Sequence, residues 1–209
     1  MSSRRHRLQA AHLYLVCDDR PDEFLEAALS GGVDVVQLRI KDGSDDAVLG
    51  AAERFSRVCE RHGALFILND RPDLVHAAGA DGVHVGQDDM PAVKARAIVG
   101  EEHLVGLSTH SPAQVDAAVG VDYIGVGPVY ETPTKPGRPA VGTALVRYAA
   151  SHAGAPFFAI GGVTAENVVD VCEAGATRIA VVRALTDARD PELAARRLRD
   201  AMRETVGST

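Results

Sequence analysis

The chain has 209 residues, of which 46% are hydrophobic and 24% charged, and these values are ordinary for one globular domain. Its net charge of −7 is spread along the sequence, tryptophan is absent and aromatic residues make up 4%, so the composition argues against a nucleic-acid-binding surface. We expect one domain over residues 1–209, with residues 1–10 as an N-terminal extension. No apolar run approaches the length of about 18 residues that a spanning helix needs, so we expect a cytoplasmic protein without a membrane partner.

Short runs rich in β-branched residues alternate with amphipathic stretches, and the cycle repeats roughly every 20 to 30 residues, which is typical of βα units. Eight strands are predicted, at residues 13–17, 33–40, 64–68, 82–85, 104–107, 123–129, 156–160 and 178–182. The helices between them are predicted to be N-capped by Asp22, Ser44, Ser111 and Thr164, whose side-chain oxygens can accept from first-turn amides.

The apolar runs are continuous, which suits strands buried on both faces in a parallel sheet covered by helices. Eight such units predict a single closed (βα)8 TIM barrel with short loops. Six units in a doubly wound sheet are the alternative architecture. No GxGxxG follows the first strand, so a dinucleotide-binding fold is not favoured. In a parallel barrel the functional residues follow the strands, and these positions are therefore the informative ones.

Polar residues follow the second predicted strand in an alternating pattern. In the segment QLRIK, the strand period of two places Gln37, Arg39 and Lys41 on one face and Leu38 and Ile40 on the other. If the polar face points inward, it brings two cations and an amide to the barrel mouth. Taken alone, the same five residues fit a solvated outer face equally well.

Acidic residues follow the third and fourth predicted strands. Asp70 lies in the segment NDR, and Asp88 and Asp89 lie in GQDD. Carboxylates from separate strand ends indicate a hard-cation site, because Mg²⁺ prefers one or two carboxylates together with water and substrate phosphate oxygens. Asp70 and Asp89 are the candidate ligands. For each aspartate alone, helix N-capping is the alternative, above all just before Pro91.

The longest predicted loop, residues 130–139, follows the sixth strand and is too rich in proline, glycine and threonine to be helix or strand. We expect a functional loop that acts as a lid over the mouth, with a solvated connector as the alternative. Gly161 and Gly162 end the seventh strand and allow backbone amides to approach a phosphate closely. A tight turn is the alternative, because paired glycines serve that purpose too.

The segments QLRIK, NDR, DGVHVGQDD, GLSTH, DYIGVGPVYETPTK and AIGGV occur in this order at the ends of successive predicted strands. Together they resemble the thiamine-phosphate synthase family, and the resemblance runs from Tyr14 to Leu185. It implies a TIM-barrel transferase that uses Mg²⁺ to condense hydroxymethylpyrimidine diphosphate with hydroxyethylthiazole phosphate. The implied products are thiamine phosphate and pyrophosphate.

Position by position, the resemblance also implies a set of ligands for each substrate. The pyrimidine diphosphate is expected on Gln37, Leu38, Arg39, Ile40, Lys41, Asn69, Ser108 and Lys135. The thiazole phosphate is expected on Thr132, Pro133, Thr134, Gly162, Val182 and Arg183. Magnesium is expected on Asp70 and Asp89, and the catalytic residues are expected to be Arg39, Lys41, Ser108 and Lys135. One position departs from the family, which often has serine where this chain has Arg183, a residue able to pair with a phosphate instead.

Three other functions remain open at this point. The chain is also consistent with a thiazole tautomerase-like enzyme, with another phosphate-binding barrel, or with a non-catalytic ligand-sensing barrel. The combined set of cations and aspartates favours the synthase, because a sensor is expected to lose costly unpaired charge at the mouth. His84 fits packing as well as catalysis, and His110 has no assigned role. A homo-oligomer is possible.

Overall fold

The computed structural model describes residues 4–132 and 140–206, and within them eight parallel strands close into a barrel. The strands are β1 Leu13–Cys17, β2 Val35–Leu38, β3 Leu65–Asn69, β4 Gly82–Val85, β5 Leu104–Thr109, β6 Tyr123–Val126, β7 Phe157–Ile160 and β8 Ile179–Val181. The helices are α1 Arg4–Ala10, α2 Asp22–Ser30, α3 Asp45–His62, η1 Pro72–Leu74, α4 Ala92–Val99, α5 Pro112–Asp116, α6 Gly142–His152, α7 Val168–Glu173, α8 Arg183–Thr186 and α9 Pro191–Val206.

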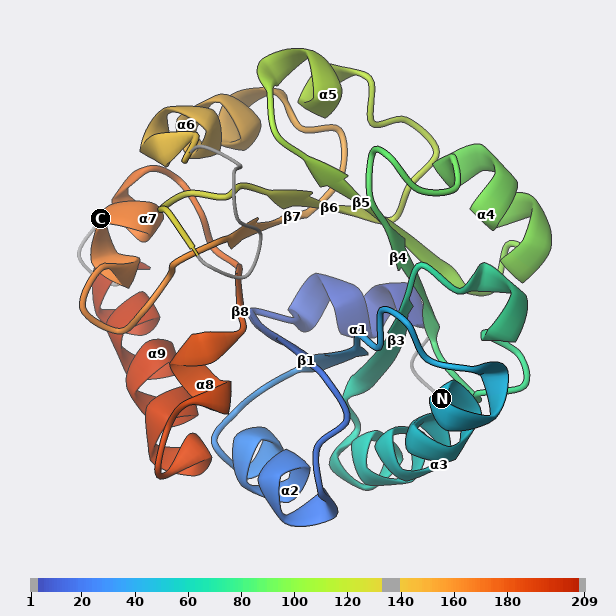
Figure 1. The fold of residues 1–209 in the computed structure, drawn as a ribbon. Coiled ribbons are helices and arrows are strands. Elements are labelled where there is room, and N and C mark those ends of the chain that lie inside the picture. Colours follow the sequence, from blue (N-terminus) through green and yellow to red (C-terminus); the bar gives the residue numbers. More distant parts are fainter. Residues whose placement is uncertain (1–3, 133–139, 207–209) are drawn as a thin grey trace.

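The strands follow one another around the barrel in chain order. Each pairs in parallel with the next, and β8 returns to β1, where Tyr14 lies opposite Ala180. Helices α2 to α9 form a ring outside the strands (Figure 1). The predicted (βα)8 TIM barrel is therefore confirmed, and the six-unit doubly wound alternative is wrong.

Every predicted apolar run contains one strand, although two of the boundaries differ in a way that matters for the site. β2 ends at Leu38, before the end of the predicted run, because its partner β1 ends at Cys17. β5 is longer than predicted, since Ser108 and Thr109 still pair with β6. The longer strand places Ser108 at a fixed position in the barrel.

The alternation of side chains along the strands divides the core into two layers. The outer layer fills the space between strands and helices, and β3 contributes Phe66 and Leu68 to it. The inner layer fills the barrel, and β3 contributes Leu65 and Ile67. Both faces of each strand are thus buried, which explains why the sequence shows continuous apolar runs.

Two of the four predicted helix caps are present. Ser44 accepts from the amide of Ala47 at the start of α3, and Ser111 accepts from the amide of Gln114 at the start of α5. The other two predictions are wrong. Asp22 is the first residue of α2 and follows its N-cap residue Pro21, and Thr164 precedes a turn that separates it from α7, which begins at Val168. In both cases the helix begins at a different residue from the predicted one, so the polar side chain is out of register.

Helix α1 closes the amino end of the barrel, a feature absent from the predicted elements. Leu8 and Ala11 belong to the inner apolar layer. The guanidinium groups of Arg4 and Arg7 pair with the Asp81 carboxylate at 2.9 Å and 2.6 Å. Asp81 also accepts a hydrogen bond from the backbone of β3. Figure 1 shows α1 behind the strands and across the barrel axis. Within the part of the chain that the structure describes, the amino end of the barrel is therefore covered, and the cavity opens at the carboxyl ends of the strands.

Candidate active site

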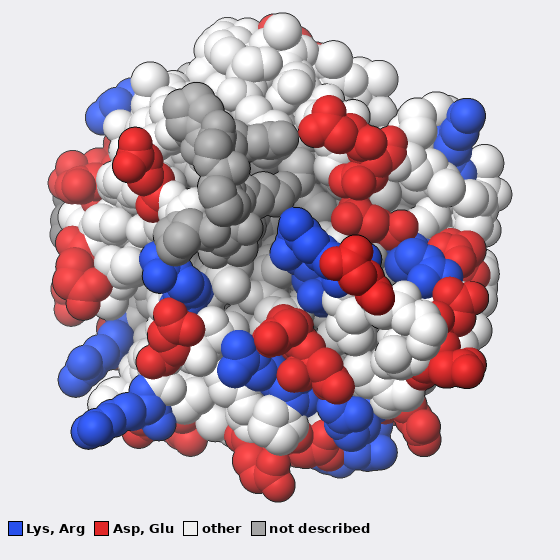
Figure 2. Space-filling model, in the orientation of Figure 1, with Lys and Arg blue, Asp and Glu red and all other residues white. Residues whose placement is uncertain are grey.

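A cavity of about 240 Å³ opens at the carboxyl ends of the strands, and every strand contributes to its lining. The strand residues that line it include Tyr14, Gln37, Asn69, His84, Ser108, Tyr123, Phe158 and Ala180. Seen from this end, the surface is hollowed near the centre, and acidic and basic side chains alternate beside the hollow (Figure 2). Both signs of charge are therefore available where a charged ligand would enter.

The polar face of β2 points into the barrel, which is one of the two orientations that the sequence left open. Gln37 is buried and donates from Nε2 to the Tyr14 hydroxyl at 2.7 Å, and Arg39 lines the cavity. Leu38 and Ile40 belong to the outer apolar layer. The strand period of two turns their side chains toward the helices and leaves their backbone near the mouth, so any contact with the pyrimidine diphosphate there is expected through the backbone.

Not all of the expected cations are at the cavity wall. Lys41 is exposed on the segment between β2 and α3 and is absent from the residues that line the cavity. Lys135, Pro133 and Thr134 lie outside the described residues, and the loop prediction for 130–139 falls largely there. Arg39 is accordingly the member of the expected cation set that the structure places in the cavity wall.

Asp70 and Asp89 come together from the ends of β3 and β4. Asp70 has a left-handed backbone, φ 58°, and its amide donates to the carbonyl of His84 at 2.9 Å. Burial raises the pKa of the Asp70 carboxyl, and the negative charge of Asp89 raises this pKa further, whereas the Asn69 amide and Arg39 lower it. The two carboxylates and Arg39 are thus close enough to interact electrostatically.

The carboxylate of Asp89 is held in place by its own turn. It accepts from the amide of Gly86 at 3.0 Å, and a Cβ atom at Gly86 would lie 2.4 Å from its Oδ2. Helix α4 starts at Ala92 with Pro91 as its N-cap residue, so Asp89 does not cap it. The capping alternative for Asp89 is therefore wrong, and its carboxylate faces Asp70 instead.

The acidic pair fits a magnesium ion. Oδ1 of Asp70 is buried and accepts no hydrogen bond from residues 4–132 and 140–206. A buried carboxylate oxygen of this kind is costly unless a cation or a proton meets it. Two carboxylates match the protein ligands that Mg²⁺ takes alongside water and phosphate oxygens. Among residues 4–132 and 140–206 no group of three or more His, Cys, Asp or Glu gathers for a metal ion.

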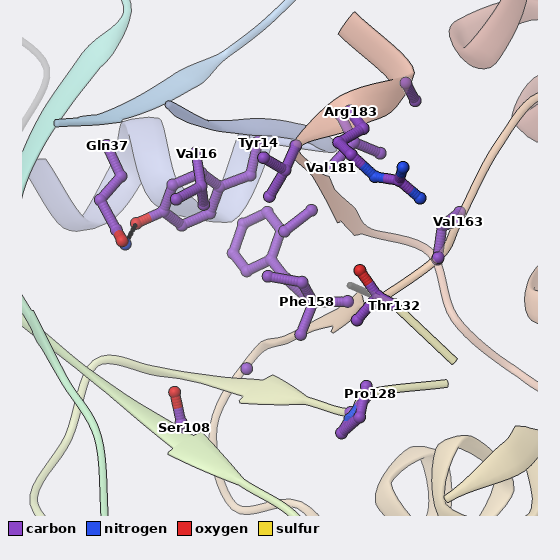
Figure 3. A pocket seen from close by; sticks show the side chains of 18 of the residues that line it. Tyr14, Val16, Gln37, Ser108, Pro128, Thr132, Phe158, Val163, Val181 and Arg183 are labelled. Atoms are coloured by element: carbon purple, nitrogen blue, oxygen red, sulfur yellow. Dashed lines mark hydrogen bonds between the residues drawn. The ribbon is translucent and has the colours of Figure 1, made fainter. Parts of the chain in front are cut away.

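The opposite wall of the cavity is built from backbone and one cation. Gly161 and Gly162 have φ values of 102° and 67°, and a Cβ atom at Gly162 would lie 2.7 Å from Cβ of Tyr130. Only glycine tolerates both the conformation and the close approach. Val182 and Arg183 line the same wall, and Arg183 extends toward Thr132 (Figure 3). Two glycines, a hydroxyl and a guanidinium group thus line this part of the cavity, and this combination suits a phosphate.

Three polar residues in the barrel interior, Tyr14, Tyr123 and His84, have a place in the site that the sequence did not predict. Tyr14 and Tyr123 are buried and hydrogen-bonded to each other at 2.9 Å, and His84 lies between Tyr123 and Ser108. The available signal was the alternation in β4, where Val83 and Val85 face outward and the residue between them must face the interior. His110 also lines the cavity, with its ring nitrogen Nδ1 against the carbonyl of Gly127.

A TIM barrel with a glycine-lined phosphate wall and an acidic pair at its mouth defines a class, the phosphate-binding barrel enzymes. The chain matches the family model described as thiamine monophosphate synthase over residues 13–185. It is 50% identical over 210 residues to the thiamine-phosphate synthase of Saccharopolyspora erythraea, covering 93% of this chain and 94% of the relative. A thiamine-phosphate synthase of Thermus thermophilus is 52% identical over 200 residues, with 91% and 96% covered. The chain therefore belongs to the thiamine monophosphate synthase family.

Two further comparisons define the extent of the likeness. The chain is 48% identical to the thiamine-phosphate synthase of Thermosynechococcus vestitus over 95% of its own length, but it spans only 58% of that longer relative. Among solved structures, the thiamine phosphate pyrophosphorylase of Pyrococcus furiosus superposes with a TM-score of 0.87 at 30% identity, covering 97% of this chain and 99% of that chain. The chain is thus an enzyme, a transferase of thiamine biosynthesis.

Proposed function

We propose that the chain condenses hydroxymethylpyrimidine diphosphate with hydroxyethylthiazole phosphate, giving thiamine phosphate and pyrophosphate. The observation that carries this proposal is the facing pair Asp70 and Asp89, with Arg39 beside it, at the mouth of a barrel whose opposite wall suits a phosphate. A diphosphate leaving group needs a divalent ion and cations, and a second phosphorylated substrate needs a separate phosphate site. Arg39 in the cavity wall beside the acidic pair, and Gly161, Gly162 and Arg183 in the opposite wall, support this assignment.

In the proposed reaction the CH2–O bond of the pyrimidine substrate breaks, and its electron pair stays with the departing pyrophosphate. The thiazole nitrogen then donates its lone pair to the carbocation and forms the new C–N bond. Neither step needs a strong general base, so the main demand is electrostatic stabilisation of the leaving group. We assign that role to Arg39, Lys41 and Lys135, with Ser108 as a hydrogen-bonding partner.

We further propose that Asp70 and Asp89 hold Mg²⁺, which when bound supplies positive charge to the pyrophosphate oxygens. The orphaned Oδ1 of Asp70 supports this assignment. Gln37 and Asn69 are proposed to bind the pyrimidine part, and the second substrate's phosphate is assigned to Thr132, Thr134, Gly162, Val182 and Arg183.

Within the described part of the chain, no helix is long and apolar enough to cross a bilayer. We propose a cytoplasmic location.

The direct test is pyrophosphate release from purified protein incubated with both substrates and Mg²⁺. We expect release that requires both substrates and is abolished by EDTA. A matched reaction lacking the thiazole phosphate separates condensation from simple hydrolysis. Binding of both substrates without release, or isomerisation of the thiazole in the absence of the pyrimidine substrate, would contradict the proposal and favour a sensor or a tautomerase.

A further inference from the structure

A continuous chain of hydrogen bonds crosses the floor of the cavity. Nε2 of Gln37 donates to the Tyr14 hydroxyl at 2.7 Å, and the hydroxyls of Tyr14 and Tyr123 are 2.9 Å apart. The Tyr123 hydroxyl lies 3.3 Å from Nδ1 of His84, and Nε2 of His84 lies 2.9 Å from the Ser108 hydroxyl. The two ends, Gln37 on β2 and Ser108 on β5, lie on different walls of the cavity in Figure 3.

The two tyrosines in the middle of this chain are shielded from water. Tyr14 is 2% exposed and Tyr123 is 1% exposed, and both rings pack edge-on against Phe158. Burial raises the pKa of both phenols, so each keeps its single proton at neutral pH. Water is therefore not available to replace a missing partner, and each proton must go to a neighbour within the chain.

One glycine of the barrel leaves the space that these hydrogen bonds need. A Cβ atom at Gly106 on β5 would lie 2.1 Å from Cζ of Tyr123 and 2.6 Å from Nδ1 of His84. Any side chain at residue 106 would thus separate the two groups. Because an inward position of a barrel strand is normally filled by an apolar side chain, this glycine indicates that the contact between Tyr123 and His84 is built into the barrel interior.

The number of protons fixes the direction of the hydrogen bonds. The Tyr14 oxygen accepts from the Gln37 amide, so the Tyr14 proton is donated to Tyr123. The Tyr123 proton is then donated to Nδ1 of His84, which leaves the proton of a neutral imidazole on Nε2, directed at Ser108. The Ser108 proton points away from His84. Among the residues that the structure describes, no hydrogen bond to Oε1 of Gln37 occurs, and Gln37 lines the cavity.

We propose that Tyr14, Tyr123 and His84 are positioning residues that give the cavity floor a fixed polarity, with an acceptor at Oε1 of Gln37 and a donor at the Ser108 hydroxyl. An acceptor at Gln37 selects a heterocycle with an exocyclic N–H donor, such as an aminopyrimidine, over the matching oxopyrimidine, whose exocyclic oxygen is an acceptor. This inference rests on the proposed function for the identity of the substrate. If the hydrogen bonds ran in the opposite direction, Gln37 would present its NH2 group and the preference for the amino substrate would invert.

The direction can be measured without any substrate. In ¹⁵N-labelled wild-type protein at pH 7.5, long-range ¹H–¹⁵N spectra distinguish a protonated ring nitrogen from a bare one, and a His84→Gln variant identifies the signals. We expect His84 to be neutral with its proton on Nε2. A proton on Nδ1, or on both nitrogens, overturns the proposal whether or not the enzyme turns over.

The consequence for specificity is tested with Tyr14→Phe and Tyr123→Phe, assayed with the aminopyrimidine diphosphate and its 4-oxo analogue. In wild type we expect the amino substrate to be preferred. In either variant the preference, as a ratio of kcat/KM values, should fall about tenfold, the worth of one net hydrogen bond, mainly through KM for the amino substrate.

Tyr148→Phe is the matched control, because its hydroxyl bonds Asp116 on the outer helices and has no link to the cavity. It should keep the wild-type preference. If folded Tyr14→Phe and Tyr123→Phe proteins also keep it, the positioning role is wrong while the proposed function stands. If wild type releases no pyrophosphate, the proposed function fails, and the His84 measurement still decides the direction of the hydrogen bonds between Gln37 and Ser108.

Discussion

Asp70 is the residue at which stability and function conflict most clearly. Its φ of 58° is unusual for a residue other than glycine, one carboxylate oxygen is buried without a partner, and Asp89 faces it with the same charge. The left-handed backbone costs conformational energy, whereas the buried oxygen and the charge of Asp89 disfavour the ionised carboxylate. A divalent ion at the proposed site would offset the two charge effects, because it would meet the buried oxygen and lie between the two carboxylates.

Asp70→Asn tests this conflict, because asparagine tolerates the left-handed backbone and carries no charge. The folded-state pKa of Asp70 is raised, so metal-free wild type is more stable when this group is protonated and loses that stability as pH rises from about 3.9 through the raised pKa. We expect the variant to be more stable than wild type at pH 7 without Mg²⁺, with a flatter pH profile, and to gain nothing from added Mg²⁺. Urea unfolding across pH, with and without Mg²⁺, measures both effects. Equal stabilisation of both proteins by Mg²⁺ would place the ion elsewhere.

Asp89→Ala and Lys135→Ala are expected to reduce kcat/KM by about 10² to 10³, the loss of an electrostatic partner of the transition state, while leaving the fold intact. Circular dichroism and steady-state kinetics with saturating Mg²⁺ check the two parts of this prediction. Asp200→Ala is the matched control, since Asp200 is exposed on α9 and only 3.8 Å from Arg203 in a surface pair. Near wild-type turnover in Asp89→Ala would remove Asp89 from the site.

At the scale of elements, α3 shows how a local sequence signal becomes structure. It is 18 residues long, begins after the Ser44 cap and ends at Gly63, whose φ of 68° suits a glycine C-cap. Its arginines reach the acidic residues of α2 and of the segment before it: Arg54 pairs with Asp19, and Arg57 with Asp22 at 2.7 Å. These surface pairs contribute little individually, so the cap and the apolar face define the helix.

Ser44→Ala is therefore expected to lower the free energy of unfolding by about 1 kcal/mol, because the amide of Ala47 loses its acceptor. Ser44→Gly should lower it by only a few tenths, about 0.3 kcal/mol, since glycine leaves the amide open to water. Urea denaturation of the two variants beside wild type measures the difference. Equal losses in both would show that the hydroxyl does not stabilise the helix.

The elements that the sequence predicts correctly are those with a periodic signal. All eight strands were found because burial on both faces makes them continuous apolar runs. Alternation put Gln37 and Arg39 on one face, and the structure shows that this face is the inner one. Helix α1 was missed because its short basic segment buries mainly Leu8, too few apolar residues to show a period. The bonds among Tyr14, Tyr123 and His84 depend on spatial register between strands, which one sequence does not contain.

At the scale of the whole molecule, the barrel separates stability from chemistry. Its amino end is closed by α1 and fixed by ion pairs to Asp81, whereas its carboxyl end carries the cavity and the acidic pair. Leu8 is 2% exposed and belongs to the inner layer beneath the cavity floor. Changes at this end should alter stability and leave the chemistry at the mouth nearly unaffected.

Leu8→Ala is accordingly expected to lower the free energy of unfolding by about 2 to 5 kcal/mol, through lost burial and a cavity, with kcat at 25 °C close to wild type. Leu193→Ala provides the comparison, because Leu193 is 45% exposed on α9 and its removal should cost no more than about 0.5 kcal/mol. Thermal unfolding and initial rates measure the two quantities. A large fall in kcat for a folded Leu8→Ala protein would show that the two ends are coupled.

The proposed function requires a divalent ion and a pyrophosphate to meet at one place, between the ends of β2, β3 and β4. The most direct measurement is a crystal structure of the protein grown with Mg²⁺ and pyrophosphate. We expect the ion within about 2.1 Å of oxygens of Asp70 or Asp89, with pyrophosphate bound to the ion and contacted by Arg39. Pyrophosphate bound away from this mouth, or a metal ion that contacts neither aspartate, would contradict the account.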